Sequence, residues 1–71
     1  MMGNTMQLVI NGKPTEFVDV RTIEDLVRVR GLKSALVAVE QNGTIVPRSE
    51  FANRAVSEGD RLEIVHFVGG G

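Results

Sequence analysis

The sequence contains no cysteine and a single histidine among its 71 residues. Without cysteine the chain can form no disulfide, hold no metal through thiolate and supply no thiol nucleophile. His66 on its own leaves no pair of imidazoles for zinc. The sequence therefore excludes thiol chemistry, predicts no metal site and suits a reducing compartment.

The sequence also has no large excess of charge of one sign and no long apolar run. Eight basic and nine acidic residues give a net charge of −1, and neither sign is clustered. Nucleic-acid binding thus loses its main electrostatic support. No apolar segment reaches the roughly 18 residues that span a bilayer, and residues 1–5 lack the order of a signal peptide. We expect a cytoplasmic protein that binds neither nucleic acid nor membrane.

A chain this short forms one domain and buries only about 60% of the surface its unfolded form exposes. We therefore expect no deep, private active-site cleft. Residues 1–5 are predicted to be a flexible N-terminal extension, residues 6–67 the folded domain, and residues 68–71 a flexible glycine-rich tail.

The N-terminal part of the domain has the pattern of a β-hairpin. Residues 7–10 are predicted to form a strand, and residues 15–20, rich in β-branched side chains, its partner. Between them, Asn11-Gly12 is the dipeptide that best tolerates the two positive φ angles of a type I′ turn. Phe17 is expected to anchor the second strand in the core.

A helix is predicted to follow. Thr22 can cap its start, and Asp25 three residues later completes a pattern like a capping box. Gly31 is placed to end the helix in the left-handed region, with Leu32 returning to the last turn as in a Schellman motif. The apolar face would consist of Ile23, Leu26 and Val27.

Three more strands are expected, over residues 36–40, 44–46 and 61–67, with Asn42-Gly43 turning the first of them into the second. Residues 49–54 read as irregular, with one helical turn starting at Ser49. The last strand has apolar residues on both of its faces, which predicts a central strand covered on more than one side.

The resulting element order, β-β-α-β-β-β, predicts the β-grasp (ubiquitin-like) roll, an α+β fold in which about five strands form a mixed sheet. The first and last strands would pair in parallel, with the helix over one face as the crossover. Because no second helix is available, apolar residues on the other face should stay exposed for a partner.

The chain ends in three glycines, Gly69 to Gly71, which carry no side chain to fill a core. At about 3.3–3.6 Å per extended residue, they could carry the terminal carboxylate roughly 10 Å beyond the domain. Such a tail could enter a channel too narrow for any side chain. The pattern predicts a narrow tail without side chains, whose terminal carboxylate is its one reactive group.

An ordered set of motifs adds a family resemblance. Residues 37–40, Asn42-Gly43, residues 45–49, residues 59–61 and residues 65–70 together resemble the sulfur carrier proteins of thiamine biosynthesis, the ThiS family. The resemblance covers the chain from Met6 onward. Gln41 departs from the pattern, because the family often has an apolar residue there.

The resemblance implies a function for Gly71. In the family an E1-like adenylyltransferase of the ThiF type uses ATP to adenylate the terminal glycine. A sulfur-donating persulfide enzyme helps convert it to a thiocarboxylate, and a thiazole synthase of the ThiG type accepts the sulfur. The chain has no phosphate-binding loop, so the partner would hold the nucleotide. The protein would then be a sulfur-carrying cosubstrate with no bound cofactor, not an enzyme.

Residues next to the tail are candidates for partner binding. Phe67 and Val68 could anchor the tail at the mouth of a partner's channel, although Phe67 could equally belong to the core. Arg48 could contact a partner or a phosphate, but an exposed loop arginine is the simpler interpretation. His66 is best read as a strand residue with its tip in water. Two acidic pairs, explained by helix-start and turn chemistry, are Glu24 with Asp25 and Glu58 with Asp60.

Three rival functions remain open at this stage. The small subunit of molybdopterin synthase, a MoaD-like relative, shares the fold, the tail and the sulfur chemistry. A ubiquitin-like modifier would end in an isopeptide bond to lysine. A plain interaction module would make no use of its glycines.

Overall fold

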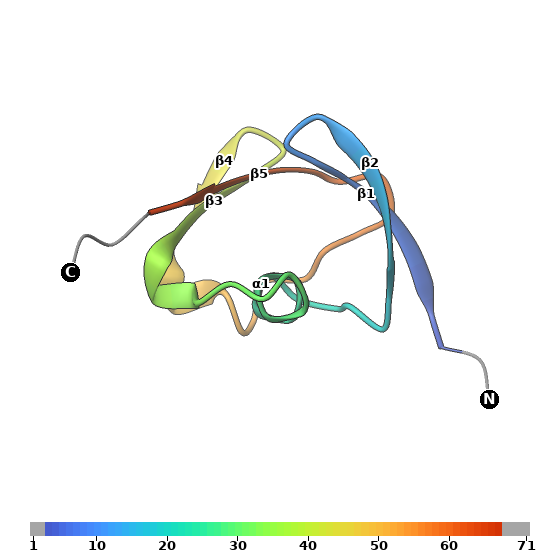
Figure 1. Ribbon diagram of the computed structural model, residues 1–71, viewed down its shortest axis with the longest axis horizontal. Helices are drawn as coiled ribbons and strands as arrows, with labels where there is room; N and C mark the ends of the chain where they lie inside the picture. Colours follow the sequence, from blue (N-terminus) through green and yellow to red (C-terminus); the bar gives the residue numbers. More distant parts are fainter. Residues whose placement is uncertain (1–2, 68–71) are drawn as a thin grey trace.

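The computed structural model describes residues 3–67 and contains a five-stranded sheet packed on one helix (Figure 1). The elements in chain order are β1 (Thr5–Ile10), β2 (Lys13–Val18), α1 (Ile23–Val29), the 3₁₀ turn η1 (Ser34–Leu36), β3 (Val37–Gln41), β4 (Thr44–Val46), the 3₁₀ turn η2 (Arg48–Glu50) and β5 (Arg61–His66). The strand order is β2-β1-β5-β3-β4, and only β1 and β5 pair in parallel. The predicted β-grasp roll is confirmed.

Both Asn-Gly hairpins form as predicted. Asn11 and Gly12 have φ angles of 50° and 84°, and Asn42 and Gly43 have 51° and 86°. Two successive positive φ angles define the type I′ turn, whose twist matches that of the flanking strands. Each short turn sets the register of its hairpin, with Ile10 opposite Lys13 and Gln41 opposite Thr44.

The helix signals are confirmed at both ends. The Thr22 hydroxyl accepts a hydrogen bond from the Asp25 N–H at 3.1 Å, and the Asp25 carboxylate accepts one from the Thr22 N–H at 3.2 Å. At the other end the Leu32 N–H donates to the Val27 carbonyl at 3.0 Å, and Gly31 has a φ of 75°. This is the Schellman ending, and it satisfies carbonyl groups that the helix leaves free.

The N-terminal boundaries differ from the prediction. The first strand begins at Thr5, two residues before the expected start at residue 7, so Thr5 belongs to the sheet and not to an extension. Asn4 adds two hydrogen bonds to Asp19, through its backbone N–H and carbonyl. The second strand runs over Lys13–Val18 instead of residues 15–20, because Asp19 has a φ of 59° and ends it.

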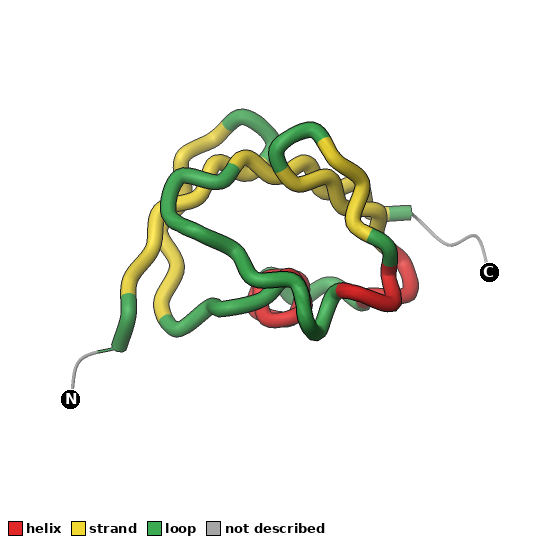
Figure 2. Tube along the Cα trace, turned by 180° about the vertical axis from the view of Figure 1, so that it is seen from behind, coloured by secondary structure: helices red, strands yellow, loops and turns green. Residues whose placement is uncertain are grey.

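Later boundaries shift by one residue. Leu36 closes the turn η1, so the strand predicted from residue 36 begins at Val37. The predicted helical turn is η2, which begins at Arg48 and not at Ser49. The last strand ends at His66. A loop then connects η2 to β5, and Figure 2 shows it crossing from the helix layer back to the sheet.

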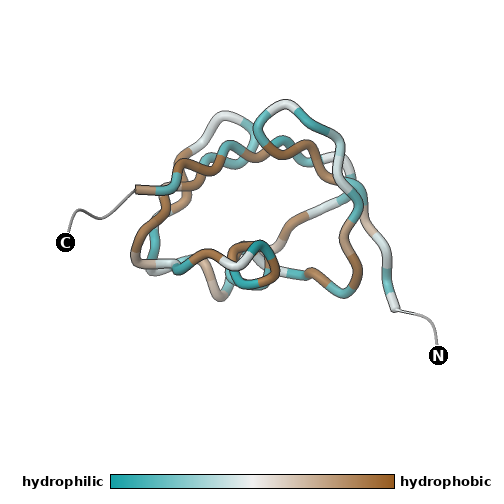
Figure 3. Tube along the Cα trace, viewed as in Figure 1, coloured by the Kyte–Doolittle hydropathy of each residue, from teal (hydrophilic) through white to brown (hydrophobic). Residues whose placement is uncertain are grey.

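The core lies between α1 and the inner face of the sheet. Its buried residues are Leu8, Ile10, Phe17, Val20, Ile23, Leu26, Val27, Val37, Val39, Val46, Phe51, Val56, Leu62 and Ile64. In Figure 3 the hydrophobic residues run along the strands, whereas the hairpin turns are white or teal. No helix within residues 3–67 is long and apolar enough to cross a membrane.

The last strand is central, as predicted, but the expectation that both its faces are covered is wrong. Leu62 and Ile64 point into the core, whereas Glu63 and Val65 alternate outward and stay exposed. No described element packs over the outer face, because the only helix of the described part lies on the inner one (Figure 1). The predicted exposure of apolar residues on this face is confirmed.

Candidate functional site

The predicted reactive tail continues from the end of β5. Val68, Gly69, Gly70 and Gly71 lie outside the described residues, so the structure does not place the expected adenylation site. The last described hydrogen bond runs from the Phe67 N–H to the Leu36 carbonyl, at 2.7 Å. The Phe67 side chain is 50% exposed, so it is not a core residue and is accessible to a partner.

Arg48 forms hydrogen bonds to the backbone segment that pairs with the end of β5. Its Nε donates to the Ser34 carbonyl at 2.8 Å and its Nη2 to the Val37 carbonyl at 3.2 Å. Val37 is in turn the pairing partner of His66. The guanidinium thus joins η1 to β3 just beside the point where the chain leaves the sheet. Sequence reasoning missed this role, because it treated Arg48 as an exposed loop residue or a partner contact.

The start of β5 is held by a cluster around Asp60. Its carboxylate accepts hydrogen bonds from the Asn42 amide at 3.0 Å, the Ser57 N–H at 2.8 Å and the Gln41 amide at 2.9 Å. Partial burial disfavours the charge, but these bonds outweigh it and hold the pKa of Asp60 below its usual value. Gln41 also donates to the Ala55 carbonyl at 2.9 Å, which explains a polar residue at this position.

The Asn11 side chain extends the central ladder beyond the end of β1. Its amide oxygen accepts from the Ile64 N–H at 2.7 Å, and its amide nitrogen donates to the Ile64 carbonyl at 3.2 Å. The side-chain amide of Asn11 thereby takes the place that the next backbone peptide of β1 would occupy beside β5. Sequence reasoning found the turn at Asn11 but not this contact, because the two residues are 53 positions apart.

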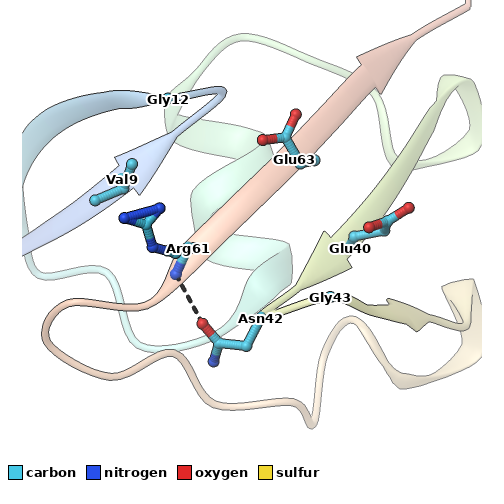
Figure 4. Close-up of a pocket in the computed structure, with 7 residues that line it drawn as sticks. All are labelled: Val9, Gly12, Glu40, Asn42, Gly43, Arg61 and Glu63. Atoms are coloured by element: carbon cyan, nitrogen blue, oxygen red, sulfur yellow. Dashed lines mark hydrogen bonds between the residues drawn. The ribbon is translucent and has the colours of Figure 1, made fainter.

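The outer face of the sheet carries two adjoining shallow hollows. The first has a volume of about 360 Å³ and lies between the hairpins (Figure 4); its lining residues are Val9, Gly12, Glu40, Asn42, Gly43, Arg61 and Glu63. The second has a volume of about 100 Å³ and a more apolar lining, made up of Ala38, Val39, Glu40, Ile45, Glu63 and Val65. Two carboxylates, those of Glu40 and Glu63, line both hollows, and Arg61 lines the first one as well.

The other predicted candidates have structural roles or none. Asp25 caps the helix, and the Arg21 N–H is the main cause of its lowered pKa; the Thr22 N–H and Arg28 add to this effect against partial desolvation. The Glu58 carboxylate accepts from the Gln7 N–H at 2.9 Å. His66 is exposed, as expected. Within residues 3–67 no three His, Cys, Asp or Glu side chains are grouped to hold a metal ion.

A helix-backed mixed sheet with an open outer face and a central last strand defines a ubiquitin-like β-grasp domain. The ThiS family model matches residues 8–71. The crystal structure of the thiamine biosynthesis protein ThiS from Geobacter metallireducens superimposes with a TM-score of 0.69 at 36% identity, and the match covers 93% of this chain and 100% of that one. The chain therefore belongs to the ThiS family, and the predicted resemblance is confirmed.

Similar proteins carry two kinds of name. The sulfur carrier protein ThiS of Bacillus subtilis is 38% identical over 65 residues, which cover 90% of this chain and 98% of that protein. A thiazole synthase of Paramagnetospirillum magneticum is 52% identical over 66 residues, 93% of this chain. The chain spans only about 20% of the length of that synthase, and the same share of a thiazole synthase of Magnetococcus marinus. The prediction of a sulfur carrier of thiamine biosynthesis is confirmed at the level of the family.

Proposed function

We propose that the protein carries sulfur on its terminal glycine, Gly71, for formation of the thiazole of thiamine. The observation that carries the proposal is the family match, which runs through Gly71. The described fold supports it, because β3 pairs with β5 as far as His66 and the Phe67 N–H donates to the Leu36 carbonyl, so the strand is held to the last described residue.

The chemistry needs activation from outside the chain. A carboxylate is a poor electrophile, since its negative charge repels nucleophiles. An E1-like adenylyltransferase would join the Gly71 carboxylate to AMP, with ATP as the source and pyrophosphate as the leaving group. The terminal sulfur of a persulfide enzyme would then displace AMP and form an acyl disulfide. A second thiol would reduce its S–S bond and become a disulfide itself, which releases the thiocarboxylate that a thiazole synthase accepts. The protein is a cosubstrate in this scheme, and the reaction takes place in the cytoplasm, where the partner finds ATP.

Mass spectrometry tests the proposal directly. The full chain is incubated with a ThiF-type adenylyltransferase, ATP, a persulfide donor and a thiol reductant, and its C-terminal peptide is weighed. We expect that peptide to gain the mass difference between sulfur and oxygen. Deletion of Gly71, or of Gly70 and Gly71, should abolish the gain while the unfolding midpoint stays unchanged. An unmodified wild-type peptide beside an active partner enzyme would contradict the proposal.

The same experiment separates the rival functions. Loaded protein is offered to a thiazole synthase and to a molybdopterin synthase large subunit, and transfer of sulfur to the second alone would favour the molybdopterin rival. Lysine-linked conjugates on a denaturing gel would indicate a ubiquitin-like modifier instead. A tail deletion without consequence for thiazole formation would leave a plain interaction module.

A further inference from the structure

The Arg48 guanidinium is hydrogen-bonded to the chain on both sides of Leu36. Its two bonds, to the carbonyls of Ser34 and Val37, measure 2.8 Å and 3.2 Å. The carbonyl of Leu36 itself accepts the Phe67 N–H at 2.7 Å. One side chain therefore fixes the backbone segment whose carbonyl holds the last described residue of the chain.

The backbone of Arg48 is itself fixed by the core. Val46, which ends β4, is buried, and so is Phe51. The Phe51 N–H donates to the Arg48 carbonyl at 3.1 Å and closes η2. The Arg48 side chain, in contrast, is exposed, and it forms no salt bridge within residues 3–67. Both of its described hydrogen bonds thus lead from a rigid base to backbone carbonyl groups.

The end of β5 depends on this segment more than the rest of the strand does. β1 pairs with β5 only at its first two residues, and the Asn11 side chain extends that contact to Ile64. From Val65 to Phe67 the described backbone contacts come from β3 and η1. Figure 1 shows the end of β5 on the same side of the domain as η1 and η2.

We propose that Arg48 is a positioning residue for adenylation of Gly71, because it fixes the Leu36 carbonyl that holds the Phe67 N–H. The inference rests on the function proposed above and names the residue that sets where the reactive end of the chain begins. With the bond in place, the adenylating enzyme has to order only the residues after Phe67. Without it, that segment lengthens toward Val65. Each added residue costs conformational entropy and lowers the local concentration of the carboxylate at the enzyme's active site.

Pyrophosphate exchange with a ThiF-type adenylyltransferase and ATP measures adenylation without any sulfur donor. In R48A we expect kcat of the exchange to fall about tenfold while KM for the carrier changes less than about twofold, because the domain still docks. R48K should fall as far, because one ammonium cannot replace the rigid fork that reaches two carbonyls. The matched control is R54A, whose arginine pairs with Glu50 in the same connection and which should behave like wild type.

Substitutions at Phe67 test whether Arg48 acts through the Phe67 N–H. Proline has no N–H, so F67P removes the bond to Leu36, whereas F67A keeps that bond and removes the ring. Adding R48A should therefore lower kcat about tenfold in F67A and leave it unchanged in F67P. An equal loss in both backgrounds would overturn the inference, because Arg48 would then act by another route.

Hydrogen exchange separates positioning from a general loss of stability. In R48A the Phe67 amide should exchange about tenfold faster or more, while the Ile64 amide, bonded to Asn11, keeps its wild-type rate. Equal acceleration at both amides would overturn the inference, since the variant would then be destabilised as a whole. A wild-type kcat in R48K would also overturn it, because the charge alone would then be sufficient.

Wild-type adenylation separates this inference from the proposed function. Pyrophosphate exchange by wild type with an equal kcat in R48A would refute the role of Arg48 while the sulfur carrier stands. Absence of any exchange with wild type, beside a partner enzyme that is active on another carrier, would refute the proposed function and the positioning role with it.

Discussion

The two faces of β5 share one backbone and differ in burial and in charge. On the inner face Leu62 is fully buried and Ile64 nearly so. On the outer face Glu63 and Val65 are exposed, and Glu63 opposes Glu40. Alternate residues of one strand thus stabilise the fold and form the open surface. The comparison teaches that the stability of this small domain depends on one face alone, which leaves the other free for recognition.

The largest expected effect comes from breaking the inner face. Leu62→Ala should lower the free energy of unfolding by about 2–5 kcal/mol, because it leaves a cavity in the only core of the described part. Val65→Ala, three residues further along β5 and on the outer face, should change the free energy of unfolding by less than about 0.5 kcal/mol. Urea denaturation of both variants measures the contrast, and equal losses would show that the outer face also supports the fold.

A smaller effect is expected from Asn11→Gly, which tests how the register of β5 is held so that the same residues stay on each face. Glycine tolerates the positive φ but loses both hydrogen bonds to Ile64, at a cost of about 1–2 kcal/mol. Because a slip of one residue would exchange the two faces, this contact helps to hold the register. Hydrogen exchange at the Ile64 amide should accelerate. Asn53→Ala, at an exposed asparagine, is the control, and equal exchange in both variants would contradict the role of Asn11.

The smallest effect should appear in acid. The pKa of Asp60 and that of Asp25 are lowered in the folded state, so the unfolded chain takes up protons first as the pH falls. Their stabilising contribution is complete above about pH 4–5 and is lost as the pH drops through the folded values. Unfolding midpoints between pH 7 and pH 3 should fall less steeply in Asp60→Asn than in wild type. Equal slopes in the two proteins would contradict the contribution of Asp60.

Local signals predicted most of the fold. The Asn-Gly turns, the capping box at Thr22 and the Schellman ending at Gly31 depend on residues within a few positions of one another, and all are confirmed. Strand ends were less predictable, because pairing decides them. Pro14, for example, lies inside β2 opposite Val9, and the sheet tolerates it because β2 is an edge strand.

The surroundings of the site depend on distant residues, so the sequence could not predict them. Arg48 reaches a carbonyl 14 positions away, and Asn11 reaches one 53 positions away. The opposition of Glu40 and Glu63 likewise needs the register between β3 and β5, which no short motif reveals. The family resemblance predicted the role of Gly71, but only the register shows which charges lie beside each other on the outer face.

The parallel pairing of β1 with β5 also constrains when the domain can be completed. Val9 meets Arg61, so the centre of the sheet joins the first of the five described strands to the last. Until β5 has emerged, β1 and β3 each have an unpaired edge and the core lacks Leu62 and Ile64. A chain interrupted before β5 therefore lacks the strand that joins the two hairpins, so the described domain can close around its core only when that last strand is in place.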